Sequence, residues 1–326
     1  MRSLGSSRWN FSKGLHDLGN GSFAYLQPDG SWGWSNAGLV VDGDQSLLVD
    51  TLFDLRLTAE MLETMRDAVP KATASFDQLV NTHANGDHCN GNELVEGADI
   101  IASRATAEEM AAEGPEVLAN FKKAAPSMGP AGQFFLDRFG AFEFEGIERP
   151  LPTRTFEGQL DLMVGDKRVS LLEVGPCHTQ GDVLVSLPDE SLVFTGDILF
   201  IDGTPIMWVG PVSNWIAACN RMIEMEVETV VPGHGPITDV QGVRAMRDYL
   251  EYVTAEARGR FDAGMPALEA AQDIALGDFD SWGDAERIVV NVVTLYREFS
   301  NDASAAPPTM DLFSTMAAIA HDRRRS

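Results

Sequence analysis

The first part of the chain alternates short apolar runs with a stretch of helical spacing. Two apolar runs flank the turn Asp42-Gly43-Asp44-Gln45, and Asp-Gly between such runs is typical of a β-hairpin. The helical pattern that follows ends at Pro70. The predicted elements are strands over 39–41, 47–49 and 78–82 and a helix over 57–69. This order of strand, helix and strand indicates an α/β architecture.

A second series of the same kind follows later in the chain. We predict strands over 169–174, 182–187, 191–194 and 228–231 and a helix over 214–225. His178, Asp197 and His234 come just after strands in this series, as His83 does in the first series. Open α/β folds place functional side chains at the carboxyl ends of strands, so these residues are candidates for one site.

Two segments are additions to the minimal sheet core. We assign the core domain to residues 20–240, which include the first of these segments. An insertion over 103–156 contains two expected helices, 105–112 and 116–125, and five phenylalanines that suit a lid or a dimer contact: Phe134, Phe135, Phe139, Phe142 and Phe144. Residues 241–326 are expected to form a helical extension packed on the core. Its predicted helices are 243–257, 267–275 and 285–299, before a polar and basic tail at 321–325.

Composition, charge and cysteine count argue against several classes of protein. The 326 residues include 24 Lys and Arg against 49 Asp and Glu, a net charge of −25, which argues against a nucleic-acid partner. Cys89, Cys177 and Cys219 make an odd number that does not suit a disulfide framework. We find neither a signal-peptide pattern nor an apolar run of the roughly 18 residues that a membrane span needs. We therefore expect a cytoplasmic protein that does not bind membranes.

The histidines carry the strongest chemical signal, because the chain has only six and four of them follow strands in glycine-rich turns. The segment His83-Ala84-Asn85-Gly86-Asp87-His88 gathers several potential ligands, and His178, Asp197 and His234 add imidazole and carboxylate groups from later turns. One histidine in such a turn is usually structural. Four together with carboxylates predict a metal site, for which zinc is suited and iron, manganese and cobalt are alternatives.

Four motifs resemble those of the metallo-β-lactamase superfamily. They are Thr82-His83-Ala84-Asn85-Gly86-Asp87-His88, Gly175-Pro176-Cys177-His178-Thr179-Gln180-Gly181-Asp182, Phe194-Thr195-Gly196-Asp197 and Val231-Pro232-Gly233-His234-Gly235. Asp50 matches the superfamily's first acidic position. The resemblance implies an α/β fold, a four-layer αββα sandwich with its metal site at one edge, here with a helical insertion and a helical C-terminal extension. It leaves the substrate open, because the superfamily includes β-lactamases, thioesterases, lactonases, alkylsulfatases, nucleases and sulfur-oxidising enzymes.

The resemblance also implies the ligand set. His83 and His178 would belong to a first metal position and Asp87, His88 and His234 to a second, with Asp197 bridging or serving a single ion. The superfamily pattern is His-x-His-x-Asp-His, and Asn85 stands at its second histidine. An amide oxygen is a weaker and harder donor than imidazole, so Asn85 is a weak ligand or none. We therefore expect one or two zinc ions per chain, with iron or manganese as alternatives.

Other residues carry weaker signals. Asp50 and Asp182 suit acceptors that fix loops or histidine tautomers rather than ligands. Cys89 and Cys177 adjoin proposed ligands, yet neighbouring side chains usually point apart, so buried thiols are the favoured interpretation. Met207 and Trp208 suit either an apolar substrate pocket or ordinary packing.

The leading functional hypothesis is a metal-dependent hydrolase that uses a metal-bound hydroxide on a small ester, thioester, lactone or related acyl substrate. Asp87 would orient the water or take a proton, and Asp197 would hold the metal. The phenylalanine-rich insertion favours a small molecule with an apolar part, and a homo-oligomer is compatible with it. Two alternatives stay open: a non-haem-iron redox enzyme acting on sulfur compounds or oxygen, and a non-catalytic metal-binding or scaffold protein with a decayed site.

Overall fold

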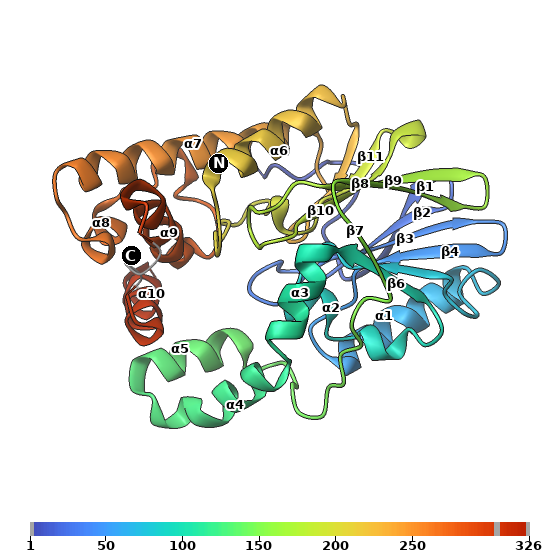
Figure 1. Cartoon of the computed structure of the whole chain (residues 1–326), viewed down its shortest axis with the longest axis horizontal. Coiled ribbons are helices and arrows are strands. Elements are labelled where there is room, and N and C mark those ends of the chain that lie inside the picture. Colours follow the sequence, from blue (N-terminus) through green and yellow to red (C-terminus); the bar gives the residue numbers. More distant parts are fainter. Residues whose placement is uncertain (1–2, 303–306, 324–326) are drawn as a thin grey trace.

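Two β-sheets face each other in the computed structural model, which describes residues 3–302 and 307–323 (Figure 1). The first sheet contains β1 (Gly14–Gly19), β2 (Ser22–Leu26), β3 (Ala37–Asp42), β4 (Gln45–Val49), β5 (Gln78–Val80), β6 (Asp99–Ser103) and β7 (Arg154–Phe156), in this order. The second has the order β12 (Thr229–Val231), β11 (Leu192–Phe194), β10 (Val183–Leu187), β9 (Lys167–Glu173) and β8 (Gln159–Val164). Strands β4 to β7 run parallel, as do β11 and β12.

Alternate residues of the strands build two separate cores. Val40 and Leu47 of the first sheet pack with Val185 of the second in the inner core between the sheets. Their neighbours along the strands, such as Leu48 and Leu184, point outward into a core shared with helices. A period of two residues therefore gives each sheet two apolar faces, and both faces are covered.

Helices complete the outer layers. On the first sheet lies α1 (Leu55–Ala68), whose N-cap Asp54 accepts a hydrogen bond of 2.8 Å from the backbone N–H of Leu57. On the second sheet lie α6 (Val212–Glu224) and α7 (Val240–Asp262), and the short α2 (Gly86–Cys89) follows β5. The expected four-layer αββα sandwich with a helical insertion and a helical extension is confirmed.

The predicted central elements are confirmed with shifts of a few residues at their ends. The insertion contains the two expected helices, α3 (Arg104–Ala112) and α4 (Glu116–Ala124), and also α5 (Gly129–Phe139), which the sequence pattern did not predict. The extension continues after α7 with α8 (Ala267–Asp273), α9 (Ile288–Ser300) and α10 (Thr309–Arg323). No helix among the described residues is both long and apolar enough to cross a membrane. Part of the basic tail, residues 324–326, lies outside the described residues.

The insertion packs against the extension of the same chain, where α5 lies beside α10 (Figure 1). Phe313 of α10 contacts the ring of Phe135 with 6.4 Å between ring centroids. Beside this contact, Arg138 of α5 pairs with Glu286 at 2.6 Å. The five phenylalanines named in the sequence are all buried, so a lid or dimer contact would have to use other side chains of the insertion.

A substitution at Gly38 tests how closely the two sheets pack. A Cβ at this position would meet the ring of Phe194 from the opposite sheet. We therefore expect Gly38→Ala to lower the free energy of unfolding by about 1–3 kcal/mol, as overpacking of a core does. Urea denaturation followed by circular dichroism measures this as a lower midpoint.

Gly259→Ala is the matched control, because Gly259 lies within α7 and a Cβ there would meet no atom within 4 Å. Helix propensity predicts that this variant gains about 0.5–1 kcal/mol. If both variants changed the midpoint in the same direction, the close packing at Gly38 would not determine stability.

Candidate metal centre

Separate turns at the ends of strands bring six side chains together at one edge of the sandwich. His83 follows β5, His178 lies between β9 and β10, and His234 follows β12. We call this group the His/Asp cluster, and its members are His83, Asp87, His88, His178, Asp197 and His234. All six are buried, and Asp87 is the most open, with 13% of its side chain exposed. Residues far apart in the sequence therefore form one compact polar group inside an apolar core.

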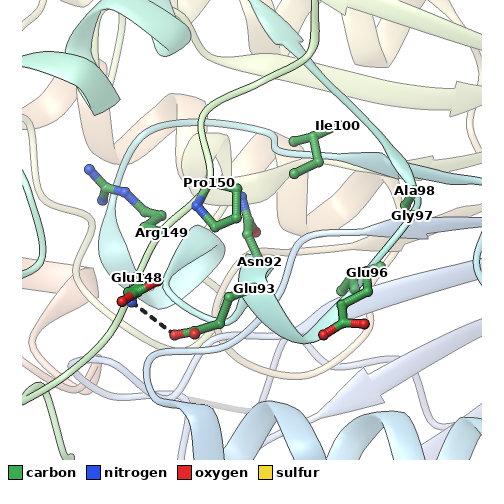
Figure 2. A pocket seen from close by; sticks show the side chains of 10 residues that line it. Asn92, Glu93, Glu96, Gly97, Ala98, Ile100, Glu148, Arg149 and Pro150 are labelled. Atoms are coloured by element: carbon green, nitrogen blue, oxygen red, sulfur yellow. Dashed lines mark hydrogen bonds between the residues drawn. The ribbon is translucent and has the colours of Figure 1, made fainter.

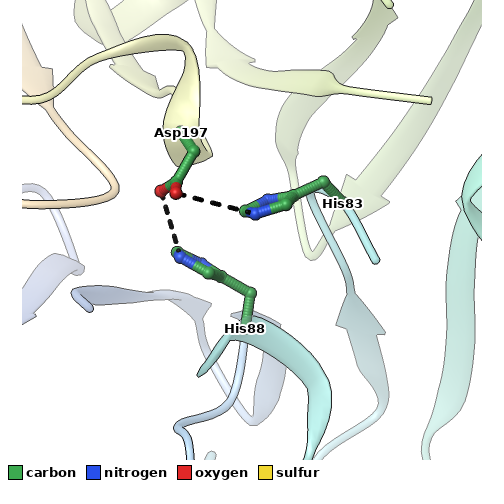
Figure 3. A group of neighbouring side chains, drawn as sticks. All are labelled: His83, His88 and Asp197. Atoms are coloured by element: carbon green, nitrogen blue, oxygen red, sulfur yellow. Dashed lines mark ion pairs between the residues drawn. The ribbon is translucent and has the colours of Figure 1, made fainter. Parts of the chain in front are cut away.

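Asp197 occupies the middle of the His/Asp cluster. Its Oδ1 lies 3.1 Å from Nε2 of His88 and 3.5 Å from Nε2 of His234. Its Oδ2 lies 3.3 Å from Nε2 of His178 and 3.8 Å from Nε2 of His83. Figure 3 shows His83 and His88 pointing at this carboxylate from two sides. One carboxylate thus lies within 4 Å of four imidazoles.

Among the residues that the structure describes, three buried atoms of the cluster find no hydrogen-bond partner: Nε2 of His83, Nε2 of His88 and Oδ1 of Asp197. Leaving such atoms unsatisfied costs free energy, and native proteins rarely do so without a reason. Two sets of ligand atoms lie within 4.8 Å of one another, namely His83, His88 and Asp197, and Asp87, His88 and His234. Imidazole nitrogen and carboxylate oxygen are suitable donors for a divalent metal. The residues therefore fit a metal ion, which could bind at unpartnered atoms of the cluster.

Each histidine is held through its second ring nitrogen, so that Nε2 faces the centre. Nδ1 of His88 lies 2.9 Å from Oδ2 of Asp50, and Nδ1 of His83 lies 3.0 Å from the hydroxyl of Thr82. For the other two histidines, Nδ1 faces a backbone carbonyl, that of Ile206 for His178 at 2.6 Å and that of Gly30 for His234 at 3.1 Å. Such contacts orient the ring and set its tautomer, as they do around metal ligands in other proteins.

The electrostatics of the His/Asp cluster also favour a cation. Burial alone would lower the pKa of His88, but Asp197, Asp87 and Asp50 raise the pKa well above its usual value. For His234 the same balance of burial against Asp197 and Asp87 raises the pKa to about 9. Burial and the neighbouring His88 lower the pKa of His83. The carboxylates thus stabilise positive charge at the centre of the His/Asp cluster. A divalent ion can supply this charge in place of protons.

Two further acids fix the turns around the cluster. Asp50 accepts hydrogen bonds of 2.7 Å from both the backbone N–H and the hydroxyl of Thr82. Asp182 accepts from the backbone N–H groups of Cys177 and Thr179, which enclose His178. Both acids therefore lie behind the histidines and not among the atoms that face the centre.

This arrangement predicts a measurable effect of Asp50. In Asp50→Asn the side chain can no longer accept from both Thr82 and His88, so the ring of His88 loses its fixed orientation. We expect zinc affinity to fall by about 10–100-fold, as for other partners of metal-bound histidines. Competition with a chromophoric chelator measures the affinity. Asp44→Asn, on the exposed turn after β3, is the control and should bind zinc as the wild type does.

A comparison with protein families identifies a family to which the residues of this arrangement match. A family model described as the metallo-beta-lactamase superfamily matches residues 30–234, which contain the whole His/Asp cluster. The chain belongs to the metallo-beta-lactamase superfamily. The resemblance seen in the four sequence motifs is thus confirmed.

Solved structures show the same metallo-beta-lactamase fold. The stereoselective inverting sec-alkylsulfatase Pisa1 from Pseudomonas sp. aligns with a TM-score of 0.67 at 14% identity, over 91% of this chain and 52% of the sulfatase. A metallo-beta-lactamase from Pontibacter korlensis aligns with a TM-score of 0.54 at 18% identity, over 73% of this chain and 98% of that chain. One from Hirschia baltica aligns with a TM-score of 0.54 at 16% identity, over 72% and 95%. This chain spans about half the length of the sulfatase.

Asn85 departs from the superfamily pattern, and the structure shows what it contacts. Its Oδ1 lies 2.7 Å from Nε2 of His178. Among the described residues, neither set of ligand atoms within 4.8 Å includes His178. Asn85 is partly exposed, and its contact with His178 is partly buried.

The remaining candidates from the sequence lie around this metallo-beta-lactamase centre. Cys89 and Cys177 are buried and donate to backbone carbonyls, Cys89 to Ala84 and Asn85 and Cys177 to Val174. Burial raises the pKa of Cys89 to about 11, so its thiol stays protonated at neutral pH. Met207 is fully buried in the core and lines no open surface. Trp208 is exposed, and its backbone N–H donates to the carbonyl of His178 at 3.2 Å.

Two residues near the centre escaped the sequence analysis. The ring of Phe200 stacks on His234, with 5.1 Å between ring centroids and 3° between planes. The buried guanidinium of Arg287 lies 4.5 Å from the ring centroid of Trp32 and 5.2 Å from that of Phe200. Arg287 comes from the extension and Trp32 from the loop before β3, so three distant segments support one side of the metal centre. No local motif connects them.

An open surface hollow of about 490 Å³ lies elsewhere, beside β6 and the segment 148–150 (Figure 2). Its lining includes Glu93 and Glu96, and the backbone N–H of Glu148 donates to Glu93 at 2.9 Å. None of the six residues of the His/Asp cluster lines it. The hollow is therefore separate from the His/Asp cluster.

Proposed function

We propose that the protein is a metal-dependent hydrolase of a small ester, thioester, lactone or related acyl substrate. The observation that supports it is the set of orphaned, inward-facing atoms of His83, His88 and Asp197 in a buried group of imidazoles and carboxylates. Superfamily membership supports the same reaction class. The net charge of −25 disfavours a nucleic-acid substrate.

The roles of the residues follow from their positions. A bound divalent metal lowers the pKa of water and polarises a carbonyl oxygen. Asp197 lies within 4 Å of four imidazoles, and the contacts at Nδ1 direct Nε2 of His83, His88 and His234 toward it. Asp87 is the carboxylate nearest to solvent, with Oδ2 at 3.2 Å from Nε2 of His234. Its Oδ2 is therefore placed to orient an attacking water, accept the proton and pass it to the leaving group.

Zinc is the metal we propose, because histidine and aspartate ligands in a small buried group suit its low coordination number. The ligand atoms come from the His/Asp cluster, and iron and manganese remain alternatives for the same donors. Metal analysis of protein purified without added metal tests this assignment. Stoichiometric zinc supports it, whereas stoichiometric iron with negligible zinc would favour a redox function.

Sulfate esters are a second candidate substrate class. The alkylsulfatase aligns over 91% of this chain and the β-lactamases over 72–73%, so its likeness covers more of this chain. Below 25% identity this likeness concerns the fold. It justifies placing alkyl sulfates beside acyl substrates in an assay.

A substrate panel tests the proposal. Zinc-loaded protein is assayed against p-nitrophenyl esters of increasing chain length, lactones, thioesters and p-nitrophenyl and alkyl sulfates. We expect metal-dependent turnover in the acyl group that the chelator 1,10-phenanthroline abolishes and added zinc restores. Turnover of sulfates alone would mean that the substrate is a sulfate ester and not an acyl compound. Failure to bind any divalent metal would overturn the enzyme assignment and favour a scaffold role.

A further inference from the structure

The number of metal ions depends on one amide side chain. Asn85 is the N-cap of α2, yet its side chain makes no capping hydrogen bond. Its Oδ1 instead lies 2.7 Å from Nε2 of His178. The imidazole that reaches the centre from the turn before β10 is therefore engaged by a neutral side chain.

The other nitrogen of His178 explains why this contact matters. Nδ1 lies 2.6 Å from the carbonyl of Ile206, which can only accept, so Nδ1 carries the proton. At Nε2 the ring meets the amide of Asn85, which satisfies it either as an acceptor through Oδ1 or as a donor through its nitrogen. In both cases His178 must give up a hydrogen bond before it can bind a metal.

The two sides of the centre differ in the donors that they offer. On one side, Asp87, His88 and His234 have their ligand atoms within 4.8 Å, and Oδ1 of Asp197 lies beside the two histidines. Three of these groups, His88, His234 and Asp197, suffice for a catalytic tetrahedral ion, which keeps its fourth position open, here beside Asp87. On the other side, the ligand atoms of His83, His88 and Asp197 also lie within 4.8 Å of one another. His88 and Asp197 are shared with the first side, so His83 is the ligand of this set that the first ion does not use.

We propose that each chain holds one divalent ion tightly, at His88, Asp197 and His234 with Asp87 beside its open position, and that Asn85 limits the centre to this ion by offering His178 an amide where a second metal would need another imidazole. His178 then serves as a hydrogen-bonding group at the side of the centre. This inference rests on the proposed metal-dependent function and specifies the composition of its site.

The test counts zinc per chain. Apoprotein is dialysed against micromolar Zn²⁺, and the bound metal is measured by atomic emission and by calorimetric titration. We expect one zinc in the wild type and two in Asn85→His, where an imidazole would join His83 and His178 in a three-histidine set. Asn120→His is the matched control, because it adds an imidazole on the exposed surface of α4 and should still bind one.

A second variant tests the same inference without creating a new ligand. His178→Ala should still bind one zinc, with an affinity within about threefold of the wild type, whereas His88→Ala should lose the ion. Two zinc ions in the wild type, one in folded Asn85→His, or loss of zinc in folded His178→Ala would each overturn the inference and leave a metal-dependent enzyme. An absence of zinc from the wild type would overturn the proposed function as well.

Discussion

Asp197→Ala is expected to lower zinc affinity by more than 100-fold and to abolish hydrolysis. The reason is its central position, since its two oxygens lie 3.1–3.8 Å from Nε2 of four histidines. Loss of an outer partner of a metal ligand costs about 10–100-fold in affinity, and Asp197 faces the centre itself. Without it, the imidazoles also lose the carboxylate that attracts them to one another. Chelator competition gives the affinity, and assay of the best substrate from the panel gives the rate.

Asp189→Ala is the control for this prediction. Asp189 is exposed in the turn between β10 and β11, so its removal changes the net charge equally without touching the cluster. Circular dichroism of both variants distinguishes loss of metal from loss of fold. Full zinc content and unchanged turnover in Asp197→Ala would contradict the assignment of the centre.

Arg287→Met is expected to lower the free energy of unfolding by about 3–5 kcal/mol, because it breaks a buried ion pair by removing one of its two partners. Arg287 pairs with Asp284 at 3.2 Å and donates to the carbonyl of Thr204 at 2.9 Å. Its guanidinium also contacts the rings of Trp32 and Phe200. Methionine retains much of the apolar volume, so the loss measures the charge and its hydrogen bonds. Urea denaturation of the zinc-free protein reports the change.

The matched control is Arg104→Met. Arg104 also forms an ion pair, with Glu157 at 2.6 Å, but more than half of each side chain is exposed. Exposed pairs contribute at most about 1 kcal/mol, so this variant should unfold close to the wild type. Equal losses in the two variants would mean that burial does not determine the contribution of Arg287.

The residues of the His/Asp cluster could be predicted to lie together because each one leaves a local signal. His83, His178 and His234 follow short apolar runs and precede or follow glycine, which marks a turn at a strand end. Their convergence then follows from the sandwich, since those strand ends meet at one edge. The contact between Asn85 and His178 could not be predicted this way, because it depends on side-chain positions 93 residues apart.

Some elements were missed for identifiable reasons. Helix α5 begins with Gly129-Pro130 and contains Gly132, which weaken a helical pattern, although Gly132 lies close to the carbonyl of Ala125, where a Cβ would clash. Strand β8 does alternate, with Leu162 and Val164 buried and Met163 exposed. That period of two residues was present in the sequence and would have identified the strand. The stack of Arg287 on Phe200 joins loops that no local pattern relates.

The long separation of the cluster residues has a consequence for how the protein matures. His83 and His234 are about 150 positions apart, and His234 reaches its place only after β12 pairs with β11. Closing so long a loop is slow compared with forming a helix. Before that step an ion would find only the local group of His83, Asp87 and His88, which binds it weakly. Tight metal uptake should therefore be among the last events of folding, and its rate should report the joining of the two sheets.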